Sequence, residues 1–385
     1  MRDEPIEGRD RLPSLTGLRF WAALLVVLYH LSRTVGQVPV VSDLSWYGRC
    51  GVTFFFVLSG FVLAWSYDGT RTRPLVFYWR RFARIWPLMA VAIVLSVAVY
   101  LALDVPVRRD GALAGLTFTN AWFTDPGIVV GGNPAVWSLS DEAFFYAVFP
   151  LLLLVLAPRR PCALLVVAGA GCAAALGLWL ASGGIDLAHR SWALDYLPLS
   201  RLTQFVVGVA VALAMRRGWR PRIGLPVALV LVVAYLAALI PWHQAVPDTE
   251  WYGPYSASQL LSTPVFALLV AAAAQADLSG RRTGLTGTWM LRLGHWSFAW
   301  YLVHEIVIRW VRHQHPALYE GAGVLAVWTA VIVVSLALAG ALYYLVEHPA
   351  ERFLRRRGPQ PAAREVTAPG RHRQMHVGGT TAGDG

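Results

Sequence analysis

The 385-residue sequence contains no lysine, so all 33 of its basic residues are arginine. Charged residues of every kind make up only 14% of the chain, whereas soluble proteins contain roughly 25%. This scarcity of charge excludes an ordinary soluble globule, and it excludes a disordered chain as well. Because 56% of the residues are hydrophobic, the composition indicates a polytopic membrane protein with most of its length in the bilayer.

Cysteine is also scarce, and Cys50, Cys162 and Cys172 form neither a CxxC motif nor a His/Cys cluster. The sequence therefore predicts no disulfide framework and no metal site. The formal net charge of +11 could indicate nucleic-acid binding, but the arginines fall in short clusters between apolar segments. That distribution is typical of membrane topology, so no nucleic-acid partner is predicted.

Ten runs of mainly apolar residues have a length that suits a transmembrane helix of about 20 residues. They cover residues 15–33, 51–67, 86–103, 135–156, 161–182, 198–215, 224–240, 258–276, 294–311 and 323–346. We therefore predict an all-α fold, a polytopic membrane helix bundle of about ten transmembrane helices. In this division residues 1–14 form an N-terminal segment and residues 15–357 the membrane domain. Residues 358–385, rich in Gly, Pro, Thr and Arg without periodicity, are predicted to be a disordered tail.

The arginines also predict an orientation. Even-numbered loops between the ten runs contain 14 arginines and odd-numbered loops contain 7. Three more arginines precede the first run and seven follow the last one, so one side of the membrane collects 24. Positive residues accumulate in cytoplasmic loops, so the even loops and both termini are predicted to be cytoplasmic in a multi-pass cell-membrane protein.

Ionisable residues inside the apolar runs are costly, which makes them candidates for function. Arg19 and His30 are eleven residues apart in the first run, on nearly the same helix face and about 16 Å apart along the axis, so we predict that both face one cavity. In the fourth run, Ser138, Glu142 and Tyr146 share one face. We predict that His30 is a general base and that Glu142, at the same outer depth, orients its imidazole. The alternatives are side chains that snorkel to the interfaces and a carboxylate that complements the helix dipole.

Three further segments contain candidate binding residues. Arg81 and Arg84 lie three residues apart at the start of the third helix and suit phosphate oxygens; anchoring at the cytoplasmic interface is the alternative. Tyr301 and His304 lie on one face of the ninth run, where they contact either substrate or neighbouring helices. Arg201, at the outer start of the sixth run, is predicted to bind substrate or to pair with an acidic group.

Together these segments resemble the acyltransferase-3 family of integral membrane acyltransferases, over residues 12–352. The matching features are Arg19 and His30 at their spacing, FFFVLSGF at 54–61, the Arg-x-x-Arg motif at Arg81 and Arg84, WSLSDEAFFY at 137–146, and looser matches at 201–208, 297–304 and 347–352. Three positions depart from the family pattern. Gln204 replaces a frequent acidic residue, Phe298 replaces Tyr, and Glu305-Ile306 replaces Trp-Pro. Members are ten-helix proteins that move acyl groups, commonly acetyl from acetyl-CoA, to hydroxyls of carbohydrates, cell-envelope glycans or natural products such as macrolides.

The resemblance implies a membrane O-acyltransferase that uses acyl-CoA, with acetyl-CoA as the first choice, and has no permanently bound cofactor or metal. Its acceptor would be a hydroxyl-bearing small molecule or glycan. Arg81 and Arg84, assisted by Arg19, would bind the donor phosphates on the cytoplasmic side, and His30 would be the base. The residues predicted to contact substrate are Ser138, Tyr146, Arg201, Tyr301 and His304.

Two other functions remain open at this point. A transporter or exporter of a lipid-linked or sugar-containing substrate would also carry polar residues on the faces of its helices. It predicts broken, Gly/Pro-interrupted helices in two corresponding halves, which the sequence does not contain. A catalytically inert scaffold would leave the matched depth of His30 and Glu142 unexplained.

Overall fold

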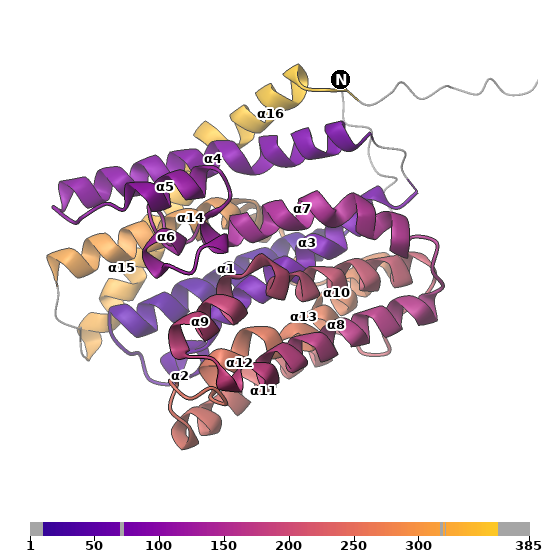
Figure 1. Ribbon diagram of the computed structural model, residues 1–385, viewed down its shortest axis with the longest axis horizontal. Coiled ribbons are helices and arrows are strands. Elements are labelled where there is room, and N and C mark those ends of the chain that lie inside the picture. The colour runs from indigo at the N-terminus through magenta and orange to yellow at the C-terminus, as the bar shows by residue number, and fades with distance from the viewer. Residues whose placement is uncertain (1–10, 70–72, 316–318, 320, 361–385) are drawn as a thin grey trace, which may run out of the picture.

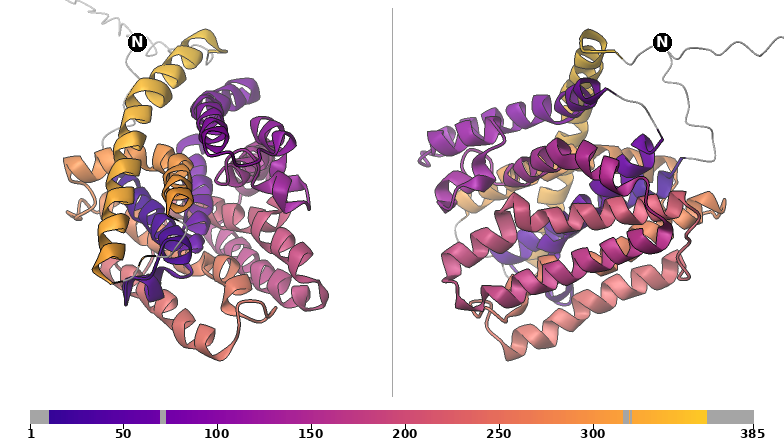
Figure 2. Two further views of the ribbon diagram at one scale, coloured as in Figure 1. Left: turned by 90° about the vertical axis from the view of Figure 1, so that its left-hand side faces the viewer. Right: turned by 45° about the vertical axis from the view of Figure 1, so that its right-hand side comes forward.

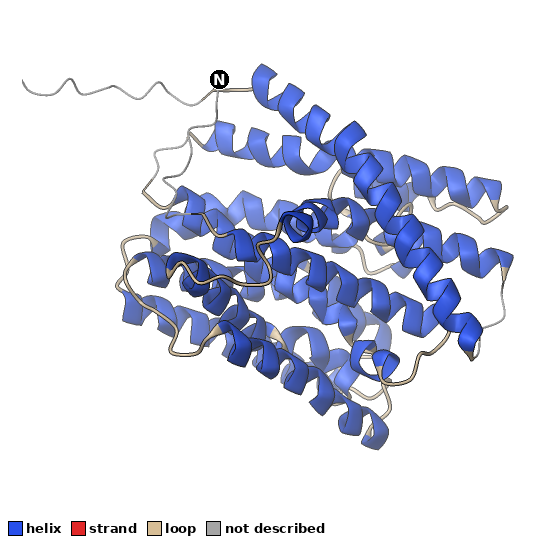
Figure 3. Cartoon of the chain, turned by 180° about the vertical axis from the view of Figure 1, so that it is seen from behind, coloured by secondary structure: helices blue, strands red, loops and turns tan. Residues whose placement is uncertain are grey.

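The computed structural model describes residues 11–69, 73–315, 319 and 321–360, and their regular structure is helical throughout (Figures 1 and 3). No strand occurs among these residues. Residues 1–10 and 361–385, which make up most of the two predicted terminal segments, lie outside the described residues. So does Arg71, one of the loop arginines counted above.

Long helices lie side by side and form the bundle in Figure 1. They are α1 (Pro13–Thr34), α3 (Gly51–Tyr67), α4 (Pro74–Ala102), α7 (Trp137–Leu156), α8 (Pro161–Ala181), α10 (Pro198–Arg216), α11 (Leu225–Ala245), α13 (Thr263–Leu278), α14 (Thr288–Gln314) and α15 (Ala322–Leu342). Shorter elements connect or extend them: α2 (Val41–Ser45), η2 (Gly48–Cys50), α5 (Arg109–Leu116), η3 (Asn120–Trp122), α6 (Pro126–Val129), η4 (Ser182–Gly184), α9 (Leu187–Ser191), η5 (Trp192–Tyr196), α12 (Pro254–Leu261), η6 (Tyr343–Glu347) and α16 (His348–Arg357). Figure 2 shows α15, η6 and α16 as one long helical segment along a side of the bundle.

Within the described residues, nine helical segments are long and apolar enough to cross a membrane. They coincide with nine of the ten predicted runs and confirm a polytopic helical membrane protein. The tenth run, 294–311, lies in α14, which is more polar because it carries Glu305, Arg309 and Arg312. With 27 residues, α14 is nevertheless about 40 Å long, and it packs against α1 and α15.

The contact between α1 and α14 sets the geometry of the site. A Cβ atom added at Gly294 would lie 2.0 Å from the carbonyl oxygen of Thr16, so only glycine allows the backbones to come this close. Further along the same pair of helices, His30 contacts Glu305. Because both contacts follow the same order along the two helices, α1 and α14 run parallel. Parallel first and ninth spans are what a ten-span topology requires.

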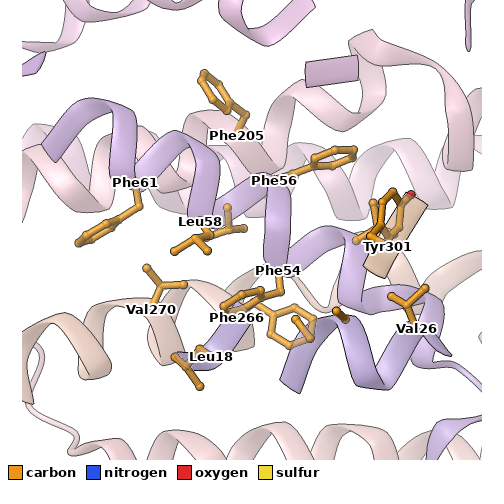
Figure 4. Close-up of a cluster of buried hydrophobic side chains, with 14 of the residues drawn as sticks. Leu18, Val26, Phe54, Phe56, Leu58, Phe61, Phe205, Phe266, Val270 and Tyr301 are labelled. Atoms are coloured by element: carbon orange, nitrogen blue, oxygen red, sulfur yellow. The ribbon is translucent and has the colours of Figure 1, made fainter. Parts of the chain in front are cut away.

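The hydrophobic core surrounds α3, which has aromatic side chains on several faces. Phe54, Phe56 and Phe61 are almost completely buried, and Figure 4 shows Phe54 beside Phe266 of α13, with the two ring centres 5.8 Å apart. Burying large aromatic rings between tightly packed helices gives rigid walls. This rigidity matters for the site because Phe56 also lines the cavity described below.

We name the two ends of the bundle after residues on them. The Arg84 end contains the start of α1 and the α16 segment, to which Arg84 is bound by ion pairs. The His30 end contains the end of α1 and the connections 35–50 and 246–253. Helix α4 begins at Pro74, twelve residues before the predicted apolar run, so Arg81 and Arg84 lie inside a continuous helix rather than at its start.

Candidate active site

A cavity of about 510 Å³ opens among α1, α3, α4, α7 and α14. Its described lining contains four arginines, Arg11, Arg19, Arg81 and Arg84, against a single carboxylate, Glu142. We call it the arginine cavity. Much of the remaining wall is apolar and comes from α3. Several guanidinium groups on an apolar wall attract a polyanionic ligand that also has an apolar part.

Arg81 and Arg84, predicted as a pair, have different partners. The NH1 nitrogen of Arg84 lies 2.9 Å from a carboxyl oxygen of Glu347 and 2.9 Å from one of Glu351. The Nε atom of Arg81 is buried and has no hydrogen-bond partner among the described residues. Arg81 therefore keeps more hydrogen-bonding capacity for a ligand than Arg84 does.

Arg19 and Glu142 lie on the wall of the same cavity. Arg19 donates from Nε to Ser297 Oγ at 3.2 Å, and Glu142 accepts a hydrogen bond from the Tyr146 hydroxyl at 3.3 Å. Ser138, Glu142 and Tyr146 all line the cavity, which agrees with the face predicted for them on α7. Polar groups thus interrupt the apolar wall along the length of the cavity.

His30 has an acidic partner at the His30 end of the bundle. Its Nδ1 atom lies 2.5 Å from Glu305 Oε1, and Glu305 Oε2 also accepts a hydrogen bond from Arg309 Nε at 3.3 Å. When Nδ1–H donates to the carboxylate, Nε2 carries the lone pair that can accept a proton. The carboxylate fixes the ring orientation and stabilises the charge that the ring gains.

The prediction that Glu142 orients His30 is wrong, because the carboxylate beside His30 belongs to Glu305. Glu142 lies instead in the arginine cavity with Arg19. Arg19 contacts Ser297, which precedes Glu305 by eight residues on α14. The level of Arg19 in the bundle therefore differs from that of Glu305 and His30 by about 12 Å along the helix axis. The prediction that Arg19 and His30 face one cavity is also wrong, since only Arg19 is among the described residues that line it.

The connection before α7 explains this difference in depth. Asn133 is fully buried, and its side-chain amide donates to the carbonyl oxygens of Ala92 and Leu302 at 3.3 and 2.9 Å. The connection therefore enters the bundle before α7 begins at Trp137. A helix that starts below the surface carries each of its residues deeper, and Glu142 is moved toward the Arg84 end.

Tyr301 stands between the arginine cavity and His30. Its hydroxyl lies 2.8 Å from Ser138 Oγ, and both residues line the cavity. The Tyr301 ring is 5.9 Å from the ring of His304, which is 5.2 Å from the ring of His30. Neither histidine is among the described lining residues. The hydrogen bond between Ser138 and Tyr301 therefore closes the deep end of the cavity.

His304 and Arg201, both predicted to contact substrate, are fully enclosed by protein. His304 Nδ1 lies 2.7 Å from the Tyr301 carbonyl oxygen, and its Nε2 has no hydrogen-bond partner in the described part of the chain. Arg201 donates from NH2 to Gln259 Oε1 at 2.5 Å. Neither side chain lines the arginine cavity.

Asp248 holds the end of α1 in place from the connection 246–253. It accepts a hydrogen bond from the Tyr47 hydroxyl at 2.6 Å, and it forms ion pairs with Arg33 at 3.2 Å and with His243 at 3.3 Å. Burial alone would raise the pKa of Asp248, but the hydrogen bonds from Tyr47 and Arg33 outweigh it and lower this pKa below its usual value. Because Arg33 follows His30 by three residues, this contact also steadies His30.

Sequence reasoning missed Glu305 as the partner of His30. The signal was present, because Glu305 is an acidic residue inside a predicted span and directly follows His304. It was noted only as a departure from a family pattern. Glu347 and Glu351, which hold Arg84, were likewise assigned no role.

The fold and this site define a class of protein, a polytopic helical membrane protein with a cationic cavity among its helices. Tyr301 separates this cavity from His304 and His30, and His30 contacts a carboxylate. Comparison with known proteins identifies it further. Residues 12–344 match an acyltransferase domain, so the chain belongs to the acyltransferase-3 family. This confirms the resemblance, and the protein is an O-acyltransferase.

Three relatives show how far the similarity extends. Acyltransferase MdmB of Streptomyces mycarofaciens is 36% identical, with 92% of this chain and 95% of that protein covered. The peptidoglycan O-acetyltransferase OatA of Listeria monocytogenes is 32% identical over 38% of this chain and 25% of its own length. The O-acetyltransferase OatA of Staphylococcus aureus is 30% identical over 38% of this chain and 26% of its own length. No solved structure gives a significant match.

Proposed function

We propose that this O-acyltransferase moves an acyl group, with acetyl as the first choice, from acyl-CoA to a hydroxyl of a carbohydrate or of a natural product such as a macrolide. The observation that carries the proposal is the 2.5 Å contact between His30 and Glu305. An alcohol is a poor nucleophile at neutral pH, so its attack on a thioester needs a positioned base. Such a base contributes a factor of about 10²–10⁴ to the rate.

The arginine cavity supports acyl-CoA as the donor. Coenzyme A carries phosphate groups at one end and the thioester at the other, joined by a flexible arm with two amides. Arg81, with Arg84 and Arg19 nearby, would bind the phosphates. The arm would then pass Glu142 and Tyr146 and bring the thioester to the deep end of the cavity. We assign the Arg84 end to the cytoplasm, where acyl-CoA is found and where the arginine bias puts the even loops.

In the chemical step, His30 Nε2 takes the proton of the acceptor hydroxyl while the oxygen attacks the thioester carbonyl carbon. The tetrahedral intermediate collapses, the carbon–sulfur bond breaks, and the leaving sulfur takes the proton from the imidazolium. The products are the acyl ester and free coenzyme A. Glu305 stabilises the imidazolium between the two proton transfers, and Arg309 holds Glu305. The step as written uses no metal and no permanently bound cofactor.

The contact between Ser138 and Tyr301 must open during this reaction. It closes the arginine cavity short of His304 and His30, so a thioester held in the closed cavity does not reach the base. Rotation of the Tyr301 side chain away from Ser138 would open a path between the arginine cavity and His30. Keeping them apart until the acceptor is present would protect the thioester from hydrolysis.

The direct test is mass spectrometry of candidate acceptors incubated with the purified protein and acetyl-CoA. A macrolide with free sugar hydroxyls and a soluble glycan fragment represent the two acceptor classes. We expect one of them to gain the mass of one acetyl group, only when both protein and acetyl-CoA are present. Acceptors that stay unmodified, together with protein-dependent movement of a sugar-containing compound across vesicles, would favour the transporter alternative instead.

A further inference from the structure

Asp141 and Arg201 are an acidic and a basic residue in the interior of the bundle, and within the described residues no ion pair or hydrogen bond joins them. Both side chains are fully buried. Within the described residues, no hydrogen bond reaches either carboxyl oxygen of Asp141, and neither Nε nor NH1 of Arg201 has a partner. Arg201 uses only NH2, which donates to Gln259 Oε1 at 2.5 Å. Buried charged side chains are normally paired or fully hydrogen-bonded, so Asp141 and Arg201 both keep hydrogen-bonding capacity for a further group.

The two charges lie beside the deep end of the arginine cavity. Asp141 follows Ser138 by three residues on α7, and Ser138 bonds to Tyr301 at that end of the cavity. The Arg201 guanidinium carbon lies 5.2 Å from the centre of the Phe56 ring, and Phe56 lines the arginine cavity. A group held between Asp141 and Arg201 would therefore lie next to the position proposed for the donor thioester.

A second pocket, of about 410 Å³, lies at the His30 end, and a chain of hydrogen bonds joins its wall to Arg201. We call it the Tyr255 pocket; α9, η5, the connection 246–253 and α12 form it, and its lining includes Ser191, Asp195, Asp248, Tyr255 and Ser256. Asp195 Oδ1 accepts a hydrogen bond from Gln259 Nε2 at 3.1 Å, and Gln259 in turn accepts from Arg201. One glutamine thus connects the wall of this pocket to Arg201.

The chemistry of the two charges restricts the group between them. It must donate a hydrogen bond to the carboxylate of Asp141 and accept one from the guanidinium of Arg201. A carboxylate or phosphate lacks the donor and an ammonium lacks the acceptor, whereas a hydroxyl has both. The acidic groups of the Tyr255 pocket do not select for a cation, because Asp195 pairs with Arg49 at 2.8 Å and Asp248 pairs with Arg33. A neutral hydroxyl-bearing ligand fits these constraints.

We propose that Asp141 and Arg201 form an acceptor subsite that holds a hydroxyl of a neutral, sugar-like acceptor, and that the acceptor arrives through the Tyr255 pocket. The proposal rests on the proposed function for calling the bound molecule an acceptor. It also specifies where each substrate enters: the donor enters from the Arg84 end and the acceptor from the His30 end. In this proposal Asp141 is a substrate-binding residue.

The transfer assay tests the subsite through the variant Asp141→Asn, which removes the charge and keeps the size of the side chain. We expect the KM for the acceptor to rise at least tenfold, while the KM for acetyl-CoA stays within twofold. Asp104→Asn is the matched control, because Asp104 is an exposed residue with a φ of 54° that asparagine also adopts readily. An unchanged acceptor KM together with a lower thermal stability would overturn the proposal and leave the pair a structural role.

A binding measurement without acyl-CoA separates this proposal from the proposed function. Saturation-transfer NMR with methyl β-D-glucopyranoside should give ligand signals with the wild-type protein and with Asp104→Asn, and much weaker signals with Asp141→Asn. The fully O-methylated glucoside, which cannot donate to Asp141, should give none. No signal with the wild type, or equal signals with Asp141→Asn, would contradict the subsite. Glucoside binding without any acetyl transfer would instead reject the proposed function alone.

A second variant tests access of the acceptor through the Tyr255 pocket, and it also tests the proposal if Asp141→Asn does not fold. Ala188 is exposed and lines the Tyr255 pocket, so Ala188→Trp should fill the opening without touching either charge. We expect a rise of at least fivefold in the acceptor KM and no change in acetyl-CoA binding. An unchanged acceptor KM in a folded Ala188→Trp protein would exclude access through this pocket.

Discussion

The two ends of α1 use charged residues in different ways. At the Arg84 end, four arginines and one carboxylate line the cavity, and a nitrogen of Arg81 has no partner among the described residues. At the His30 end, the charges are matched, because Glu305 contacts both His30 and Arg309. An excess of cations attracts an anionic ligand, whereas a matched pair fixes the geometry of one reacting group. Under the proposed function, the donor binds at the Arg84 end and the chemistry takes place at the His30 end.

Replacement of His30, the proposed base, should have the largest effect on kcat. We expect His30→Ala to lower kcat by about 10²–10⁴-fold, because the acceptor hydroxyl loses its base, while acyl-CoA still binds at the other end. Turnover and calorimetric binding of acetyl-CoA measure the two ends separately. His189→Ala, a change at an exposed histidine, is the control. Equal loss of binding and turnover would break the separation between the two ends.

Replacement of the partner carboxylate should have the next largest effect. Glu305→Gln can still accept a hydrogen bond from His30 but cannot stabilise the imidazolium charge, so we expect kcat to fall by roughly 10–100-fold. Glu250→Gln, at an exposed glutamate, should leave kcat unchanged. A larger loss in Glu142→Gln, through kcat rather than through the KM for acetyl-CoA, would restore Glu142 as the partner of the base.

Changes in the cavity should affect donor affinity instead. A charge-assisted hydrogen bond contributes about 1.5–3 kcal/mol, so Arg81→Ala should raise the KM for acetyl-CoA by roughly 10–100-fold. Arg84→Ala should raise it less and lower the thermal stability more, because Glu347 and Glu351 lose their shared cation. Arg281→Ala, at an exposed arginine, is the control for both. If Arg84→Ala raised the KM for acetyl-CoA more than Arg81→Ala did, Arg84 rather than Arg81 would be the main phosphate ligand.

The smallest expected effect concerns the connection that holds the end of α1. The pKa of Asp248 is lowered in the folded protein, so its contribution to stability is present at neutral pH and is lost as the pH falls below the usual carboxyl value of about 4. Asp248→Asn should therefore lower the Tm by a few degrees at pH 7, and this difference should shrink on acidification. Tm values of the detergent-solubilised protein across this pH range measure it. A Tm difference that does not depend on pH would show that the charge of Asp248 is unimportant.

Much of the bundle could be predicted from the sequence because the relevant signals are local. A run of about 20 apolar residues indicates a span without knowledge of its neighbours, and i, i+4 spacing put Ser138, Glu142 and Tyr146 on the same wall. α14 was predicted as a span despite its charges, and its contacts with α1 and α15 explain how such a helix is accommodated in the bundle.

The partner of His30 could not be predicted because it depends on depth. Depth along α7 follows from where the preceding connection enters the bundle, which Asn133 determines through carbonyl groups of α4 and α14. These contacts join residues that are 41 and 169 positions apart in the chain, and no helical periodicity contains them. The unpartnered atoms of Asp141 and Arg201 could not be predicted for the same reason.

The central claim is that His30 and Glu305 act as one catalytic unit, and a double-mutant cycle tests it most directly. The kcat for acetyl transfer is measured for the wild type, His30→Ala, Glu305→Gln and the double variant, each confirmed as folded by its binding of acetyl-CoA. If Glu305 acts only through His30, the double variant should be no slower than His30→Ala. Losses that multiply in the double variant, or a His30→Ala protein that transfers acetyl at nearly the wild-type rate, would contradict the claim.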